Sequence, residues 1–185
     1  MSNNNLIIGI LVAITKNGWI GMCGKLPWEY VGKKLDGDLP RFKQTTIGAG
    51  SNAIIFGRKT LESFGKQALP GRLNIVLSRD PDYIAPKDVT RYFSYDDAID
   101  TLKHQRINGH AIEEIWICGG KTVYEEALRP GRNRATVIIK TVTHDDYEGD
   151  VAFPNYDIAN WQTENIQKFD DKGYDVITQS LIRLS

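Results

Sequence analysis

Residues 115–122 read Ile-Trp-Ile-Cys-Gly-Gly-Lys-Thr, so a short apolar run passes directly into two glycines, a lysine and a threonine. A related pattern stands at residues 54–60, where Ile-Ile-Phe is followed by Gly-Arg-Lys-Thr. Each stretch predicts a buried strand, a tight turn and the first turn of a helix. Two such strand-to-helix units favour an α/β fold with a parallel sheet.

Apolar runs on both sides extend this pattern. Leu6–Ile14 is almost continuously apolar, as expected of a strand that is buried on both faces. Further strands are predicted at Ala53–Phe56, Asn74–Ser78, Val89–Phe93, Glu114–Cys118 and Ala135–Val142. A C-terminal hairpin is predicted from Thr163–Phe169 and Tyr174–Leu184, joined by Asp170–Gly173.

Helices fit between these strands. One is predicted from near Asp38 past Phe42, a second from about Lys59, a third from Ser94 to about His104 and a fourth over Thr122–Leu128. Ser94 with an aspartate three residues later is an N-terminal capping signature. The sequence predicts one α/β domain over residues 1–185, with a mainly parallel eight-stranded sheet, an antiparallel C-terminal hairpin and helices on both faces.

Composition indicates an ordinary globular chain of 185 residues, with 41% hydrophobic and 25% charged residues. Lysine plus arginine equals aspartate plus glutamate at 23 each, which gives no reason to expect a nucleic-acid or membrane partner. Two cysteines and three scattered histidines indicate neither a disulfide framework nor a metal site. The first apolar run is too short for a membrane span and has no basic leader. We expect a cytoplasmic monomer.

The two glycine turns are candidate phosphate sites. Glycine lets the backbone approach a ligand closely, and a helix N-terminus offers free N–H groups. Arg58, Lys59 and Lys121 add positive charge, while Thr60 and Thr122 add hydroxyls. Two such turns at one sheet edge could hold a ligand with well-separated phosphates. The alternative is that the glycines only end their strands and the lysines are solvated, and the residues alone leave both interpretations open.

Two common phosphate motifs are excluded. A Walker motif needs a glycine where Ile115 stands, and a Rossmann fingerprint needs its glycines after the first strand, where the sequence has Thr15–Gly21. A dinucleotide would therefore have to bind to another architecture.

Asp38 is the main candidate for a catalytic carboxylate. It shares a helix face with Phe42, four residues later, and a carboxylate on an apolar face is costly unless it is paired. From the residues alone the favoured role is a helix cap, for which Asp36 competes. The stretch Gly24–Trp28 predicts either a lid over a ligand or a surface loop anchored by Trp28.

Taken in order, these residues resemble the dihydrofolate reductase family from Leu6 to about Pro154. The matching blocks are Ile20-Gly21 with Leu26-Pro27-Trp28, Asp38-Leu39 with Phe42-Lys43, Gly57–Thr60 with Glu62-Ser63, Leu69-Pro70-Gly71-Arg72, Gly119-Gly120 with Val123-Tyr124, and Glu148-Gly149-Asp150 with Phe153-Pro154. Each block is weak alone, but six in collinear order are specific.

The resemblance implies the roles of the catalytic residues. Asp38 would contact the pterin amino group and N3, and would favour protonation of N5 through water. Trp28 would hold that water, Thr141 would bond the carboxylate and Leu26 would exclude solvent. Burial raises the pKa of a carboxyl and hydrogen bonds to its charged form oppose this, and we predict a net upward shift for Asp38.

The same resemblance implies the binding residues and the cofactor, NADPH, because the cations at the adenosine end favour the extra 2′-phosphate. The predicted substrate-binding residues are Leu11, Val12, Ala13, Asp38, Phe42, Lys43, Ser63, Phe64, Leu69, Arg72, Cys118 and Thr141, with Arg72 paired to the glutamate-tail carboxylate. The predicted cofactor-binding residues are Ala13, Ile20, Gly57, Arg58, Lys59, Thr60, Ser78, Arg79, Cys118, Gly119, Gly120, Lys121, Thr122, Val123 and Tyr124.

Three features depart from the family pattern. Glu29–Gly37 is longer than its counterpart in compact bacterial members, and its conformation stays open between a helix and a flap. Cys118 replaces a branched aliphatic residue beside the pterin site, and Lys121 replaces a frequent third glycine. The implied activity is NADPH-dependent reduction of 7,8-dihydrofolate to tetrahydrofolate. Two alternatives are a reductase of another pterin or pyrimidine on the same fold, and a non-catalytic NADPH-binding protein.

Overall fold

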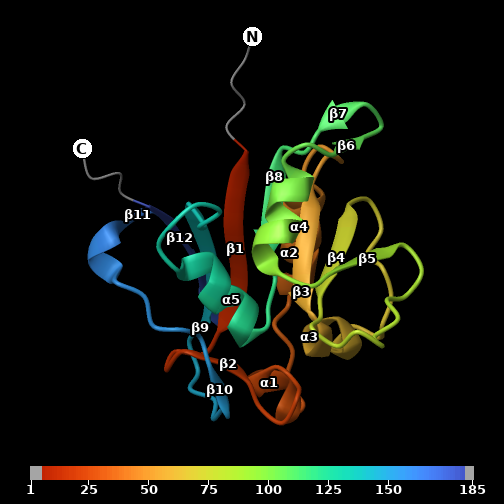
Figure 1. Cartoon of the computed structure of the whole chain (residues 1–185). Helices are drawn as coiled ribbons and strands as arrows, with labels where there is room; N and C mark the ends of the chain where they lie inside the picture. Colours follow the sequence, from red (N-terminus) through yellow and green to blue (C-terminus); the bar gives the residue numbers. More distant parts are fainter. Residues whose placement is uncertain (1–5, 182–185) are drawn as a thin grey trace.

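The computed structural model describes residues 6–181 and contains an eight-stranded sheet with the strand order β11-β12-β9-β1-β8-β3-β4-β5 (Figure 1). The strands are β1 (Ile7–Ile14), β3 (Ala53–Gly57), β4 (Leu73–Leu77), β5 (Val89–Tyr92), β8 (Glu114–Ile117), β9 (Val137–Thr143), β11 (Trp161–Phe169) and β12 (Tyr174–Leu181). β1 lies between β8 and β9 and is parallel to both. β12 runs antiparallel to β9 and to β11, which confirms the predicted mixed sheet.

Helices cover both faces, as predicted. They are α1 (Pro27–Tyr30), α2 (Asp38–Ile47), α3 (Arg58–Ser63), α4 (Tyr95–Leu102) and α5 (Lys121–Leu128), with the 3₁₀ turns η1 (Ile158–Asn160) and η2 (Asp170–Lys172). The alternation of side chains along β1 explains the two layers. Ile10 and Val12 join the core under α4 and α5, whereas Leu11 joins a second core with Leu61 of α3.

Element ends agree closely with the prediction, with small corrections. The helix predicted to reach His104 ends at Leu102, although Ser94 caps it as predicted, since its side chain accepts a hydrogen bond from the Asp97 N–H at 3.2 Å. The strand predicted from Ala135 begins at Val137. The last three residues of the predicted strand Tyr174–Leu184 lie outside the described residues.

Short elements escaped the prediction. β2 (Trp19–Gly21) pairs with β10 (Val151–Ala152), and β6 (Arg106–Ile107) pairs with β7 (His110–Ala111). Strands of two or three residues are too short to show an alternating pattern, and α1 covers a single turn. Within the described range, no helix combines the length and the apolar content that crossing a bilayer requires.

Candidate active site

A cleft of about 990 Å³ lies beyond the carboxyl ends of β1, β3 and β8. Ligands bind at this edge in open α/β sheets. In Figure 1, α1, β2 and α3 gather at this edge, opposite the end where the chain enters β1. The wall joins residues 11–13 of β1 to α2, to the two glycine turns and to the end of β4.

One end of the cleft contains a largely buried carboxylate. The Thr141 hydroxyl donates a hydrogen bond to Asp38 Oδ1 at 2.8 Å, across 103 positions of sequence. Thr141 lies in the middle of β9, in register with Ala13 of β1, so the sheet fixes its position. The Asp38 side chain is only 19% exposed. Both residues line the cleft.

The helix-cap interpretation of Asp38 and Asp36 is wrong. The N-cap position of α2 is Gly37, with φ +89°, and no side chain caps the helix. A Cβ at Gly37 would lie 2.8 Å from the Tyr174 hydroxyl, so a glycine is needed here for its space as well as for its backbone. The Asp38 carboxylate is therefore free of the capping role and faces the cleft.

Burial raises the pKa of the Asp38 carboxyl, while the Thr141 hydrogen bond and the positive charge of Arg41 partly oppose that rise. The direction agrees with the predicted one. A carboxyl with a raised pKa close to a reacting ring is suited to proton chemistry.

Aromatic and aliphatic side chains form the wall around this carboxylate. Phe42 of α2 stacks against Phe64 at 6.2 Å between ring centroids, and Phe64 contacts Phe56 at 5.6 Å. The cleft is lined here by Leu11, Leu26, Phe42 and Phe64. This end is suited to a flat, mainly apolar ring with a polar edge directed at Asp38.

The other end is built from the two glycine turns, which touch each other. The Gly57 N–H donates to the Gly119 carbonyl at 2.6 Å. Gly119 has φ +109° and is joined to Gly120 by a cis peptide bond. A Cβ at Gly57 would lie 3.2 Å from a Val123 methyl, and one at Gly120 would lie 3.1 Å from the Thr60 hydroxyl. Side chains at these glycines would crowd the place where the two turns meet. That place lies next to the N-terminus of α5.

Cations surround this end of the cleft but are not equivalent. Arg58 binds Glu62 at 3.0 Å and Asp80 at 2.7 Å, and its guanidinium lies 4.9 Å from the centre of the Tyr83 ring. Within residues 6–181, neither Lys59 nor Arg79 has an acidic partner within ion-pair distance, and both line the cleft. The charge of Arg58 is thus largely neutralised within the protein, which the sequence analysis did not foresee.

A family model described as dihydrofolate reductase matches residues 7–183. The chain belongs to the dihydrofolate reductase family. It is 38% identical over 154 residues to the dihydrofolate reductase of Aedes albopictus, covering 78% of this chain and 77% of the relative. It is 34% identical over 157 residues to the type 3 enzyme of Salmonella typhimurium, covering 85% and 84%.

A solved structure of the same family has a similar fold. Dihydrofolate reductase from Enterococcus faecalis, in complex with NADP(H) and RAB-propyl, superimposes with a TM-score of 0.76 at 30% identity, covering 95% of this chain and 96% of that one. The similarity extends over the C-terminal hairpin, where the sequence blocks fade.

Most residues predicted from the family resemblance meet in the cleft. Among the catalytic set, Leu26, Asp38 and Thr141 line it. Trp28 is 2% exposed and packs edge-on against Tyr147 at 6.4 Å, so it anchors the loop, while Leu26 of the same loop faces the cleft. All fifteen residues predicted to bind the cofactor line the cleft, from Ala13 to Tyr124.

Three predicted substrate residues lie outside the cleft wall. Lys43 is exposed on α2, and Leu69 packs against the second core, which contains Leu61. Arg72 donates to the Pro70 carbonyl at 3.1 Å and also contacts Thr46. Their roles in substrate binding stay predictions. Cys118 does line the cleft, and burial raises the pKa of its thiol far above the usual range.

The structure adds wall residues that the sequence analysis missed. Arg41 lies one helical turn after Asp38, and a search for charges at i+3 would have found it. Phe93 follows β5 and is 60% exposed at the nucleotide end, where the rule on strand ends would have drawn attention to it. The segment 29–37 begins in α1 and is held by Lys33, which binds Asp145 at 3.2 Å.

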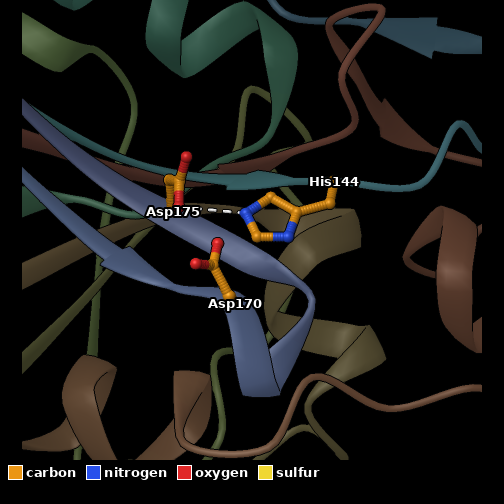
Figure 2. Close-up of side chains that lie close together, drawn as sticks. All are labelled: His144, Asp170 and Asp175. Atoms are coloured by element: carbon orange, nitrogen blue, oxygen red, sulfur yellow. Dashed lines mark hydrogen bonds and ion pairs between the residues drawn. The ribbon is translucent and has the colours of Figure 1, made fainter.

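A second polar cluster lies away from the cleft (Figure 2). His144 Nε2 lies 2.9 Å from Asp175 Oδ1, and Asp170 of η2 approaches the same group from the hairpin turn. The backbone N–H of His144 also donates to the Gly173 carbonyl at 2.8 Å. The imidazole nitrogen that faces the carboxylates already has a partner. The cluster therefore ties the end of β9 to the hairpin turn.

Proposed function

We propose that this chain catalyses the NADPH-dependent reduction of 7,8-dihydrofolate to 5,6,7,8-tetrahydrofolate. The observation that carries the proposal is a single cleft with a largely buried carboxylate, hydrogen-bonded to a threonine, at one end and two touching glycine turns at the other. Membership of the dihydrofolate reductase family supports the same reaction.

The residues at the nucleotide end fit a dinucleotide phosphate. The glycine turns have space only because no Cβ is present, and the first helical residues after Gly120 leave N–H groups free for an anion. Lys59 and Arg79, which have no acidic partner within residues 6–181, would bind the 2′-phosphate that distinguishes NADPH from NADH. When bound, NADPH supplies the hydride from its nicotinamide ring.

The residues at the pterin end would orient the acceptor and control the proton. Asp38 would accept hydrogen bonds from N3 and the amino group of the pterin, holding C6 in line for hydride transfer. Its charge would favour protonation of N5 through a water held near Trp28. Leu26 would cover the ring and exclude bulk solvent. The hydride and one proton together complete the reduction across the C6–N5 bond.

The remaining assignments follow from the same proposal. Arg72 and Lys43 would bind the glutamate tail, on the condition that Arg72 releases its contact with Pro70. We further propose a monomer in the cytoplasm. The two free thiols fit a reducing compartment, and the equal numbers of acidic and basic residues fit a chain without nucleic-acid or membrane partners. Light scattering of the purified chain would measure its oligomeric state.

Steady-state assays on two substrate types test the proposed reaction. With NADPH we expect turnover of 7,8-dihydrofolate, measured by the loss of reduced-cofactor absorbance, and no turnover of a pyrimidine substrate. Turnover of the pyrimidine alone would replace the substrate class. Tight NADPH binding without reduction of either compound would show that the chain is a binding protein.

A further inference from the structure

Arg41 brings a second charge to the proton site. It follows Asp38 by one turn of α2, and its Nη1 atom lies 3.9 Å from Asp38 Oδ1, the oxygen that already accepts the Thr141 hydroxyl. The Arg41 side chain is 20% exposed and lines the cleft. Its Nη1 atom is fully buried and has no hydrogen-bond partner within residues 6–181.

The C-terminal hairpin holds this guanidinium in place. The guanidinium carbon lies 4.8 Å from the centre of the Phe169 ring and 5.1 Å from that of Tyr174. Arg41 Nη2 donates to the Tyr174 hydroxyl at 3.2 Å, and that hydroxyl donates to the Asp36 carbonyl at 2.7 Å. Tyr174 is completely buried, so its hydroxyl is a fixed acceptor.

This arrangement differs from a surface arginine that packs its stem. An arginine near a surface normally extends its charged group into water, because burying an N–H without an acceptor is costly. Here two aromatic faces and one hydrogen bond fix the guanidinium with its free N–H beside the carboxylate. A function for the free Nη1 donor in the cleft would explain why the protein tolerates the cost of burying it without an acceptor.

We propose that Arg41 is a positioning residue for the reaction: it keeps the Asp38 carboxylate ionised and directed at the pterin ring. The proposal rests on the proposed function for the role of that carboxylate. A positive charge within about 4–6 Å favours the ionised form of an aspartate. An ionised carboxylate can accept hydrogen bonds from two pterin N–H groups at once, whereas a protonated one loses an acceptor.

Other groups around Asp38 do not replace this charge. β9 contributes the uncharged Thr141, and the hairpin contributes Tyr174 and, behind Phe169, the Lys172 ammonium. Lys25 and Glu29 carry opposite charges on the cleft wall before α2. Arg41 is the cation whose field lowers the pKa of the Asp38 carboxyl, against the effect of burial.

Carbon-13 NMR titration of the aspartate carboxyls in the ligand-free protein tests the proposal, with the Asp38 signal assigned by its absence in Asp38→Asn. In Arg41→Met the Asp38 midpoint should rise by about one pH unit, at the lower end of the 1–3 units typical of such pairs because the arginine is partly exposed. Arg41→Lys, which keeps a charge without the planar fork, should show a smaller rise. Lys168→Met, which removes an exposed cation from the same hairpin, should leave the midpoint unchanged.

The pH profile of turnover supplies a second readout. In Arg41→Met the pH profile for dihydrofolate turnover should move to higher pH, as the Asp38 midpoint does. The KM for NADPH should be unchanged. If Arg41→Met does not fold, Tyr174→Phe removes only the hydroxyl that holds Nη2, and a smaller upward shift of the Asp38 midpoint is expected. An unchanged midpoint in the folded variant, even with lowered thermal stability, would overturn the proposal.

The two proposals can fail separately. The titration uses no substrate, so a missing dihydrofolate activity would end the proposed function without affecting the Asp38 midpoint. An unaltered midpoint in an active Arg41→Met enzyme would end the role of Arg41 and leave the reaction standing.

Discussion

The pterin end of the cleft is made of side chains that converge from distant segments, whereas the nucleotide end is made largely of backbone. Asp38 accepts a hydrogen bond from Thr141, which lies 103 positions later in the sequence. It also lies beside Arg41, whose guanidinium packs against two aromatic rings. The nucleotide end is two local turns of four residues, joined by one hydrogen bond between Gly57 and Gly119. Proton chemistry needs a buried carboxylate with tuned surroundings, while anion binding needs only N–H groups, space and nearby cations.

Removing the carboxylate should separate the two ends most clearly. In Asp38→Asn we expect turnover to fall by about 10²–10⁴-fold, the range for losing a group that assists proton transfer. NADPH affinity should not change, because the glycine turns are untouched. Single-turnover kinetics and cofactor fluorescence would measure the two effects. Undiminished hydride transfer would remove Asp38 from the mechanism.

A side chain in the nucleotide turn should produce the opposite pattern. Gly119 has φ +109°, and a Cβ there would lie 3.3 Å from the Tyr124 hydroxyl. Strain of roughly 1–3 kcal/mol in Gly119→Ala should weaken NADPH binding by about 5–150-fold if binding needs the native turn. The Asp38 titration should stay as in the parent.

A matched variant controls for strain alone. Gly109, in the β6–β7 turn outside the cleft wall, also has a positive φ and open space around it. Gly109→Ala should lower thermal stability and leave NADPH affinity intact. Equal loss of affinity in both variants would break the assignment of the Gly119 turn to the cofactor.

The unequal cations give a smaller effect. Arg79→Ala should reduce the preference for NADPH over NADH by about tenfold, since a hydrogen bond to a charged group contributes roughly 1.5–3 kcal/mol. Arg58→Ala should reduce it less, because Glu62 and Asp80 already bind that guanidinium. Ratios of kcat/KM for the two cofactors would measure both, and a larger loss in Arg58→Ala would reverse the assignment.

Stability should show the cost of the buried carboxylate. Burial raises the pKa of folded Asp38 above that of the unfolded chain, so its contribution to stability is complete below the unfolded pKa, near 4, and is lost as pH rises through the folded pKa. Asp38→Asn lacks this loss. Its Tm should exceed that of the parent at pH 7 by roughly 2–4 °C for each kcal/mol of destabilisation that the substitution removes. This difference in Tm should disappear in acid. Calorimetry at several pH values would measure the difference in melting temperature. A difference that stays constant with pH would contradict this account.

Local features were predictable from sequence, and long-range ones were not. The two glycine turns, the Ser94 cap and the strands of the main sheet follow from patterns within a few residues. The contact of Asp38 with Thr141 came only from the family resemblance, because no local pattern relates residues on α2 and β9. The cap assigned to Asp38 failed because Gly37 takes a left-handed conformation and Asp38 bonds instead to a residue of the sheet. The ion pair of Arg58 with Asp80 was missed because Asp80 lies on another loop, whereas Glu62 lies four residues after Arg58 on the same helix and was within reach of a local pattern.

A crystal structure with NADPH and a folate analogue would test the central claim most directly. We predict that the Asp38 carboxylate lies about 2.7–3.2 Å from N3 and the amino nitrogen of the pterin. The nicotinamide ring should stack against a face of the same pterin ring. A pterin bound elsewhere, with the Asp38 side chain turned to bulk solvent, would contradict the account.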